Sequence, residues 1–257
     1  QLKKRRKEVL SKALKRDSLS EFVKLGHVVG GHPRIKDQPP LIFHQEGADT
    51  EEYRAKMQES LGRYRESLSV DRRVLLDRYQ MVDNALKVVG VGSVGTTCGI
   101  ALLFAAEEDP LFLQVKEARQ SVLEPYSGFA GHDSHGARVV HGQRLMQAAS
   151  DMFLGHYIGD SDKHYYVRQL RDVKVKPLVE IFSPANMLGF ARNCGWALAR
   201  AHARSGDAAI IAGYIGAGDT LADAIAQFSE SYADQNERDH KTLIEAIRDG
   251  VLEAYTE

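Results

Sequence analysis

Apolar positions recur at two spacings along the 257-residue chain, and each spacing predicts a different kind of element. Apolar residues three and four apart, which indicate helices, occur near both ends of the chain and once in the middle. The helices are expected at 1–25, 50–83, 137–153, 187–203, 221–232 and 234–255. Short apolar runs rich in β-branched residues lie between them and predict strands. These strands are expected at 86–92, 111–116 and 165–170.

Residues 26–49 show neither spacing and contain several glycines and prolines, so they are interpreted as a connector. Within it, Pro39-Pro40 precedes an extended segment, Leu41-Ile42-Phe43, that we expect to be held by apolar contacts. The chain is therefore divided into an N-terminal helical segment with this connector, a strand-rich lobe and a C-terminal helical lobe. The expected bounds are 1–83, 84–183 and 184–257. Separate helical and strand-rich stretches favour an α+β fold over a regular alternation of strands and helices.

Composition narrows the class of protein. Apolar residues make up 43% and charged residues 27%, which is typical of a globular chain. The longest apolar run, Ile100–Ala106, has seven residues, whereas a membrane helix needs roughly 20, so no membrane span is expected. Two cysteines, Cys98 and Cys194, are too few for a disulfide framework or a structural zinc site. With no recognisable leader, these features favour a cytoplasmic protein.

Charge is unevenly distributed, although the net charge is only −1. Residues 1–25 carry a net charge of +6 and include the basic run Lys3–Lys7. A run of this kind suits either a nucleic-acid backbone or a solvated helix face. Because no aromatic residue interrupts it, the solvated face is favoured and nucleic acid is not expected as a partner.

The segment Gly90–Gly95 reads G-V-G-S-V-G and fits the pattern G-x-G-x-x-G. Glycines allow a backbone to approach a phosphate closely, but a glycine-rich hairpin gives the same pattern. In a Rossmann unit, residues 96–108 would form a helix after the glycines and 111–116 the second strand. Glu117, 22 residues after Gly95, would then hold a ribose.

In a kinase-like lobe, the same glycines cap a hairpin over ATP and a third strand delivers a lysine to the phosphates. Residues 96–103 would then be a strand, and Lys116, 21 residues after Gly95, would lie on the third strand. The β-branched residues and internal glycine of 96–103 disfavour a helix. No strand–helix–strand alternation continues downstream, so the kinase-like geometry is favoured. By itself, Lys116 also suits a strand-end lysine that reaches solvent.

Several long motifs carry a resemblance to a known family. They are VVGVGSVGT (88–96), DPLFLQVKEARQSVLEPY (109–126), GQRLMQAASDMFLG (142–155), YYVRQLRDVK (165–174), CGWALARAHARSGD (194–207) and YADQNERDH (232–240). From about Asn84 to its C-terminus the chain resembles the bacterial domain-of-unknown-function family 2252, with weaker similarity upstream through Pro39-Pro40. That family is grouped with protein-kinase-like and aminoglycoside-phosphotransferase-like folds. The resemblance implies a small antiparallel-sheet lobe and a helical lobe, flanked here by N-terminal helices.

The resemblance also implies roles for single residues. Gly90, Gly92, Ser93 and Gly95 would form the loop that covers the phosphates, and Lys116 would contact them from the third strand. Residues 168–170 would be the hinge, in which Gln169 and Leu170 offer backbone groups to an adenine. Helix 187–203 would lead towards the catalytic loop.

Two departures limit what the resemblance implies. Family members resemble a permuted kinase, with G-D-x-H-x-x-N-F-G and D-F-D stretches before the glycines that supply the base and the metal ligands. Neither stretch occurs in this chain, and an acidic position in the helix after the lysine strand is His141. Glu124 is the nearest spare carboxylate in sequence, but nothing in the sequence places it near Lys116. We therefore expect binding of ATP with Mg²⁺, an unidentified acceptor, and catalysis that is weak or absent.

A second hypothesis is a non-catalytic interaction or regulatory module in which the glycine segment is structural. No catalytic residue or metal site is assigned. The segment His132–His135 has metal-ligand residue types, but four polar residues between glycines are typical of a loop. Asp207, in the stretch His202–Asp207, resembles a degenerate catalytic loop without its later asparagine, and a helix end or turn is favoured there.

Overall fold

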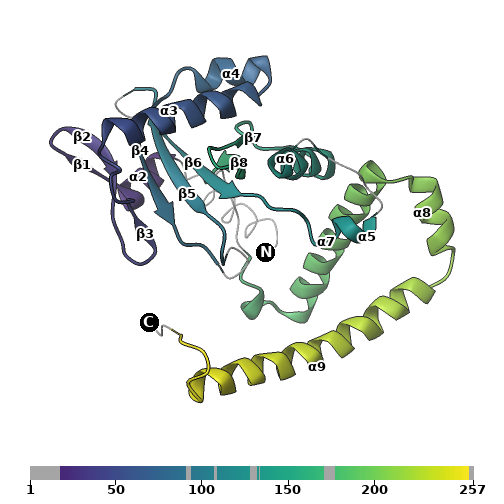
Figure 1. The fold of residues 1–257 in the computed structure, drawn as a ribbon. Coiled ribbons are helices and arrows are strands. Elements are labelled where there is room, and N and C mark those ends of the chain that lie inside the picture. Colours follow the sequence, from purple (N-terminus) through teal and green to yellow (C-terminus); the bar gives the residue numbers. More distant parts are fainter. Residues whose placement is uncertain are drawn as a thin grey trace. The chain divides into compact units, whose positions relative to one another are not determined.

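The computed structural model describes residues 18–90, 94–106, 109–127, 132, 134–170 and 177–254. The fold is α+β, as the sequence predicts, with the strands gathered in antiparallel sheets (Figure 1). Contacts divide the chain into two compact units, 1–197 and 198–257, which are described separately. The expected boundary between residues 83 and 84 falls inside a strand, β4 (Gln80–Lys87).

The segment predicted as an irregular connector contains regular structure, which corrects that interpretation. After helix α2 (Ser18–Leu25), strands β1 (Gly26–Val29) and β2 (His32–Ile35) form an antiparallel hairpin. Gly30 and Gly31 both have positive φ, +57° and +83°, as a tight two-residue hairpin turn requires. The strands are too short for their alternation to be recognised in the sequence. The basic run Lys3–Lys7 lies outside the described residues.

Side-chain contacts fix the connector, residues 26–49, to the main sheet. The ring of His44 lies between two carboxylates, with Nδ1 at 2.8 Å from Asp37 and Nε2 at 3.1 Å from Asp83. Asp83 also accepts a 2.6 Å hydrogen bond from the backbone N–H of Ile35. Just before His44, the predicted extended segment forms strand β3 (Ile42–Phe43), in which Ile42 is buried.

The main sheet has six strands in the order β3-β4-β5-β6-β8-β7, and every neighbouring pair is antiparallel. Besides β3 and β4 it contains β5 (Cys98–Phe104), β6 (Pro110–Glu117), β7 (Gly155–Ile158) and β8 (His164–Gln169). A Rossmann unit requires a helix directly after the glycines, where the chain instead forms β5. The strand therefore excludes the Rossmann alternative.

Alternating residues of this sheet enter two separate cores. One face, which we call the cavity face, carries Leu103 and Leu113 and packs against helices α3 (Glu51–Glu66) and α4 (Val70–Leu76). The opposite face, which we call the lysine face because it also carries Lys116, buries Leu102 and Phe112 beneath residues of α2 and β2. Figure 1 shows α3 lying across the sheet. Thr50 is the N-cap of α3, because its side chain accepts a hydrogen bond from the N–H of Tyr53.

Helices α5 (Glu124–Ser127) and α6 (His135–Met146) follow β6, and α6 packs on β7 and β8. At Gly136 a Cβ atom would lie 2.3 Å from the carbonyl oxygen of Tyr165, so only glycine allows this approach. The helix predicted at 137–153 ends at Met146, and β7 follows it. Four residues are too few to give a recognisable strand pattern.

Downstream, a 3-10 helix, Val179–Ile181, precedes α7 (Pro184–Ser205), which runs through the boundary between the two units. The second unit also contains α8 (Ala208–Ile215) and α9 (Thr220–Arg248). Helix α9 is continuous where two helices were expected. Asp207 is the N-cap of α8 and accepts hydrogen bonds from the N–H groups of residues 209 and 210, which confirms its interpretation as a helix-end residue.

Within the described ranges, none of the helices alone has the length and apolar character of a membrane span. Only helices α8 and α9 taken together reach that length and apolar character, and a bend of 80° separates them.

Candidate functional site

Residues 88–97, which we call the glycine segment, join two neighbouring strands: β4 ends at Lys87 and β5 begins at Cys98. Gly90 and Gly95 belong to the described residues, whereas the predicted site residues Gly92 and Ser93 lie outside them. Gly95 has a φ of +74°, a conformation that a residue with a side chain rarely adopts. The glycine at this position is therefore required by the backbone.

A buried carboxylate holds the end of the glycine segment. The Glu117 side chain is 6% exposed; it accepts a 2.8 Å hydrogen bond from the Thr97 N–H and pairs with Arg119 Nε at 2.7 Å. Arg119 also donates from Nη2 to the carbonyl oxygen of Gly95. Burial raises the pKa of Glu117, but the Thr97 and Arg119 hydrogen bonds outweigh it and lower this pKa to about 2. Glu117 and Arg119 thus fasten residues 95–97 to the end of β6.

Lys116 lies on the third long strand, one residue before Glu117, and on the opposite face of the sheet. Its register partners are Cys98 on β5 and Tyr166 on β8, so these three side chains share the lysine face. Burial raises the pKa of the Cys98 thiol, while the positive charges of Lys116, Lys87 and Arg168 oppose that shift. The strand register places Lys116, Lys87 and Arg168 on the same face of the sheet as this buried thiol.

No carboxylate forms an ion pair with Lys116 or Lys87 among the residues that the structure describes. Arg168 is held differently, since its guanidinium donates from Nε and Nη2 to Gln114 Oε1 at 3.3 and 3.2 Å. Gln114 is 5% exposed and in turn contacts the Cys98 sulfur at 3.7 Å. This part of the lysine face is positively charged and suited to an anion.

The two residues predicted to offer backbone groups to an adenine are already engaged. The N–H of Gln169 donates to Asp151 Oδ2 at 2.5 Å, and the N–H of Leu170 donates to the carbonyl oxygen of Phe112 at 2.9 Å. Gln169 also belongs to the cavity face, because its register partner is Leu113. In this arrangement neither N–H is available to a ligand on the lysine face.

The structure gives Glu124 another partner than Lys116. Its carboxylate pairs with Arg138 Nε on α6 at 3.2 Å. His141 lies instead in a row of imidazole rings, with centroids 5.4 Å from His132 and 6.3 Å from His156. Sequence spacing did not bring these three histidines together. Over the described part of the chain, no group of three histidine, cysteine or acidic residues is placed to hold a metal ion.

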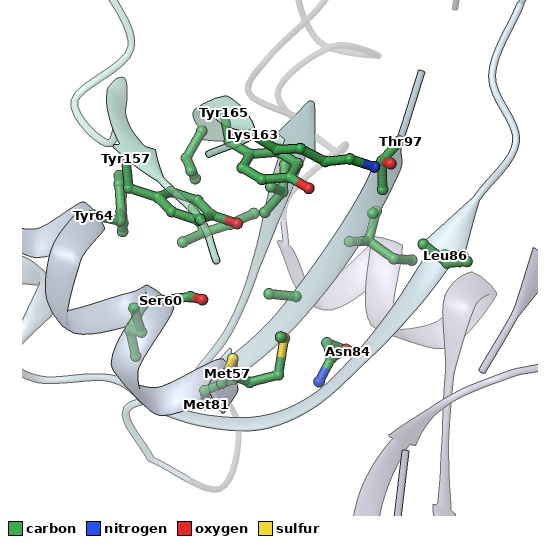
Figure 2. A pocket seen from close by; sticks show the side chains of 18 of the residues that line it. Met57, Ser60, Tyr64, Met81, Asn84, Leu86, Thr97, Tyr157, Lys163 and Tyr165 are labelled. Atoms are coloured by element: carbon green, nitrogen blue, oxygen red, sulfur yellow. The ribbon is translucent and has the colours of Figure 1, made fainter. Parts of the chain in front are cut away.

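A cavity of about 350 Å³ opens on the other side of the sheet, between α3 and the cavity face. Figure 2 shows Met57 and Ser60 reaching towards it from α3, with Tyr157 and Tyr165 at one end and Asn84 across the space. The rings of Tyr157 and Tyr165 stack with centroids 5.0 Å apart. Sequence analysis missed this cavity because its lining comes from separate elements whose residues resemble ordinary helix and strand positions.

Comparisons with known proteins identify a family but no characterised relative. No curated protein and no solved structure matches the chain. A family model described as "Uncharacterized protein conserved in bacteria (DUF2252)" matches residues 1–246. That range includes the glycine segment, Lys116 and the cavity-lining residues. On this match, which spans nearly the whole chain and agrees with the resemblance seen in its motifs, the protein belongs to the bacterial DUF2252 family.

Proposed function

We propose that the lysine face and the glycine segment 88–97 bind the phosphate groups of a nucleotide, with ATP as the first candidate. The observation that carries this proposal is that Lys116 on β6, Lys87 on β4 and Arg168 on β8 share the lysine face of the sheet. Lys87 directly precedes the glycine segment and Cys98 directly follows it. A polyphosphate would supply the negative charge that this part of the sheet lacks.

The order of the elements supports a kinase-like lobe. In such a lobe a glycine-rich segment covers the phosphates, a lysine on the third strand contacts them, and a helix follows that strand. Here the glycine segment joins β4 to β5, Lys116 lies on β6, and α6 follows in the chain. The lysine–glutamate pair of an active kinase has no counterpart with Glu124, which pairs with Arg138.

The described residues do not form a magnesium site, so Mg²⁺ would enter with the nucleotide phosphates. We derive no phosphoryl-transfer step and propose binding only. The base of the nucleotide would not be recognised through the N–H groups of residues 169 and 170, because both are donated within the protein.

One observation favours the second candidate, a non-catalytic module with a structural glycine segment. Glu117 and Arg119 tie residues 95–97 to β6 through the backbone, which restrains the segment without any ligand. In that case Lys116 and Lys87 would bind an anionic surface of another macromolecule and discriminate poorly between ATP and inorganic phosphate.

Titration with a fluorescent ATP analogue, in the presence and absence of Mg²⁺, tests the proposal. Lys116→Ala is expected to raise the dissociation constant at least tenfold, because a charge-assisted contact contributes about 1.5–3 kcal/mol. The matched control is Lys56→Ala, which removes an exposed lysine that pairs with Glu52 on α3. Inorganic phosphate and NAD serve as competitors. Equal affinity in wild type and Lys116→Ala, or no binding to folded wild type, would overturn the proposal.

A further inference from the structure

We propose that the cavity between α3 and the cavity face is a binding site for a neutral, planar molecule about two aromatic rings in size. The ligand would also carry a hydrogen-bond acceptor. This inference does not depend on nucleotide binding, because the cavity lies on the opposite face of the sheet from Lys116.

The size of the cavity sets the size of the ligand. Its volume is about 350 Å³. A cavity of roughly 150 Å³ in another protein is large enough to hold benzene, and ligand pockets start at roughly 300 Å³. The space therefore suits a two-ring compound and is much larger than an ordinary packing defect.

Two tyrosines hold the helix away from the sheet and keep this space open. The hydroxyl of Tyr53 donates to Asn84 Oδ1 on β4 at 2.6 Å, near the start of α3. The hydroxyl of Tyr64 donates to the carbonyl oxygen of Phe153 at 2.6 Å, near its end. Between these supports the strand β5 lines the cavity with Gly99, Ile100 and Ala101, and the side chain of Ile100 belongs to the core of the opposite face. Small side chains below a supported helix leave a hollow that neighbouring residues cannot fill by collapse.

The lining combines flat apolar walls with hydroxyl groups. The stacked rings of Tyr157 and Tyr165 form one wall, and Met57 and Met81 provide adaptable apolar surface opposite (Figure 2). The hydroxyls of Ser60 and Tyr157 have no hydrogen-bond partner among the described residues, and both are free to donate to an acceptor on a ligand. Burial raises the pKa of Tyr157 strongly, so its hydroxyl keeps its proton at neutral pH.

The charged residues at the cavity already have partners, which argues for a neutral ligand. Asp160 pairs with Arg63 at 3.0 Å, and Lys163 lies 4.0 Å from Glu117 Oε2. An ionic ligand would add a charge to a largely apolar space without a spare counterion.

The probe for this site is 6-propionyl-2-(dimethylamino)naphthalene, a neutral two-ring fluorophore whose ketone accepts a hydrogen bond and whose emission shifts to the blue in apolar surroundings. We expect saturable binding with a dissociation constant on the order of 10 μM. Ser60→Phe places a ring in the cavity and should weaken binding at least tenfold. Tyr157→Phe removes one donor and should weaken it by a factor of about 3 to 10.

The matched control is Ala55→Phe, which adds the same ring at an exposed position of α3. Its binding should equal that of wild type. The proposal is overturned if the probe does not bind folded wild type, or if Ser60→Phe binds it as tightly as Ala55→Phe does. Circular dichroism and thermal melting of each variant establish that it is folded, and Tyr157→Phe gives a second readout should Ser60→Phe not fold.

Discussion

The two faces of the main sheet are built from the same strands but differ in chemistry. On β5 and β6, residues 98, 114 and 116 point to one face and residues 99, 101, 113 and 115 to the other. The lysine face carries three cations and the Cys98 thiol, whereas the cavity face is largely apolar and hollow. A one-residue alternation thus separates a candidate anion site from a candidate site for a neutral ring. Glu117 stands where the two regions meet, since its carboxylate accepts a hydrogen bond from the N–H of Thr97 at the end of the glycine segment.

The largest expected effect comes from the core of the lysine face. Leu102 is 0% exposed, and Leu102→Ala should lower the free energy of unfolding by about 2–5 kcal/mol, because it leaves a cavity beneath α2 and β2. Urea denaturation measures the change. Leu188→Ala, at a position 55% exposed, is the control and should change stability by less than about 0.5 kcal/mol. Similar values for the two variants would contradict the assigned core.

Two glycines of α6 test how this helix packs on the sheet. Gly136 lies against β8, whereas Gly142 has open space around it. Gly136→Ala should destabilise the protein by about 1–3 kcal/mol, since the new Cβ would meet the carbonyl oxygen of Tyr165. Gly142→Ala has open space around it and should stabilise the same helix by about 0.5–1 kcal/mol. Thermal or urea denaturation gives both values. The same sign for both substitutions would show that α6 does not pack in this way.

The lowered pKa of Glu117 predicts that the stability of the folded chain depends on pH in the acid range. Its pKa falls from an ordinary value of 4.5 to about 2 in the folded chain, so its contribution to stability is complete above about 4.5. The contribution is lost as pH falls from about 4.5 to about 2. In urea denaturation over this range, the stability difference between wild type and Glu117→Gln should shrink steadily. A constant difference would mean that the carboxylate is not held by Thr97 and Arg119.

The sequence predicted the elements with strong patterns and missed those defined by contacts. The α+β class, the strand at 111–116 and the role of Asp207 follow from local residue types, and the structure confirms them. The β1–β2 hairpin and β7 were missed because four-residue strands carry too little pattern. The two helices expected at 221–232 and 234–255 form the single helix α9, because no proline or glycine separates them.

The candidate site was predicted only in part. Spacing placed Lys116 on the third strand of the lobe, but the position of Lys87 and Arg168 on the same face depends on strand register, which the sequence does not reveal. The hinge predicted at Gln169 and Leu170 could not be assessed without knowing that Asp151 and Phe112 engage their N–H groups. The cavity depends on how Tyr53 and Tyr64 support α3, a tertiary arrangement with no local signal. The roles of Gly92 and Ser93 stay predictions.

The most direct test of the central claim is a titration of the isotope-labelled chain with Mg-ATP, followed residue by residue through its amide NMR signals. The account predicts saturable shifts at Gly90, Gly95 and Lys116, and their loss in Lys116→Ala while the signals of Ser60 and Tyr157 stay in place. Shifts confined to the residues that line the cavity, or no shifts at saturating nucleotide, would contradict it.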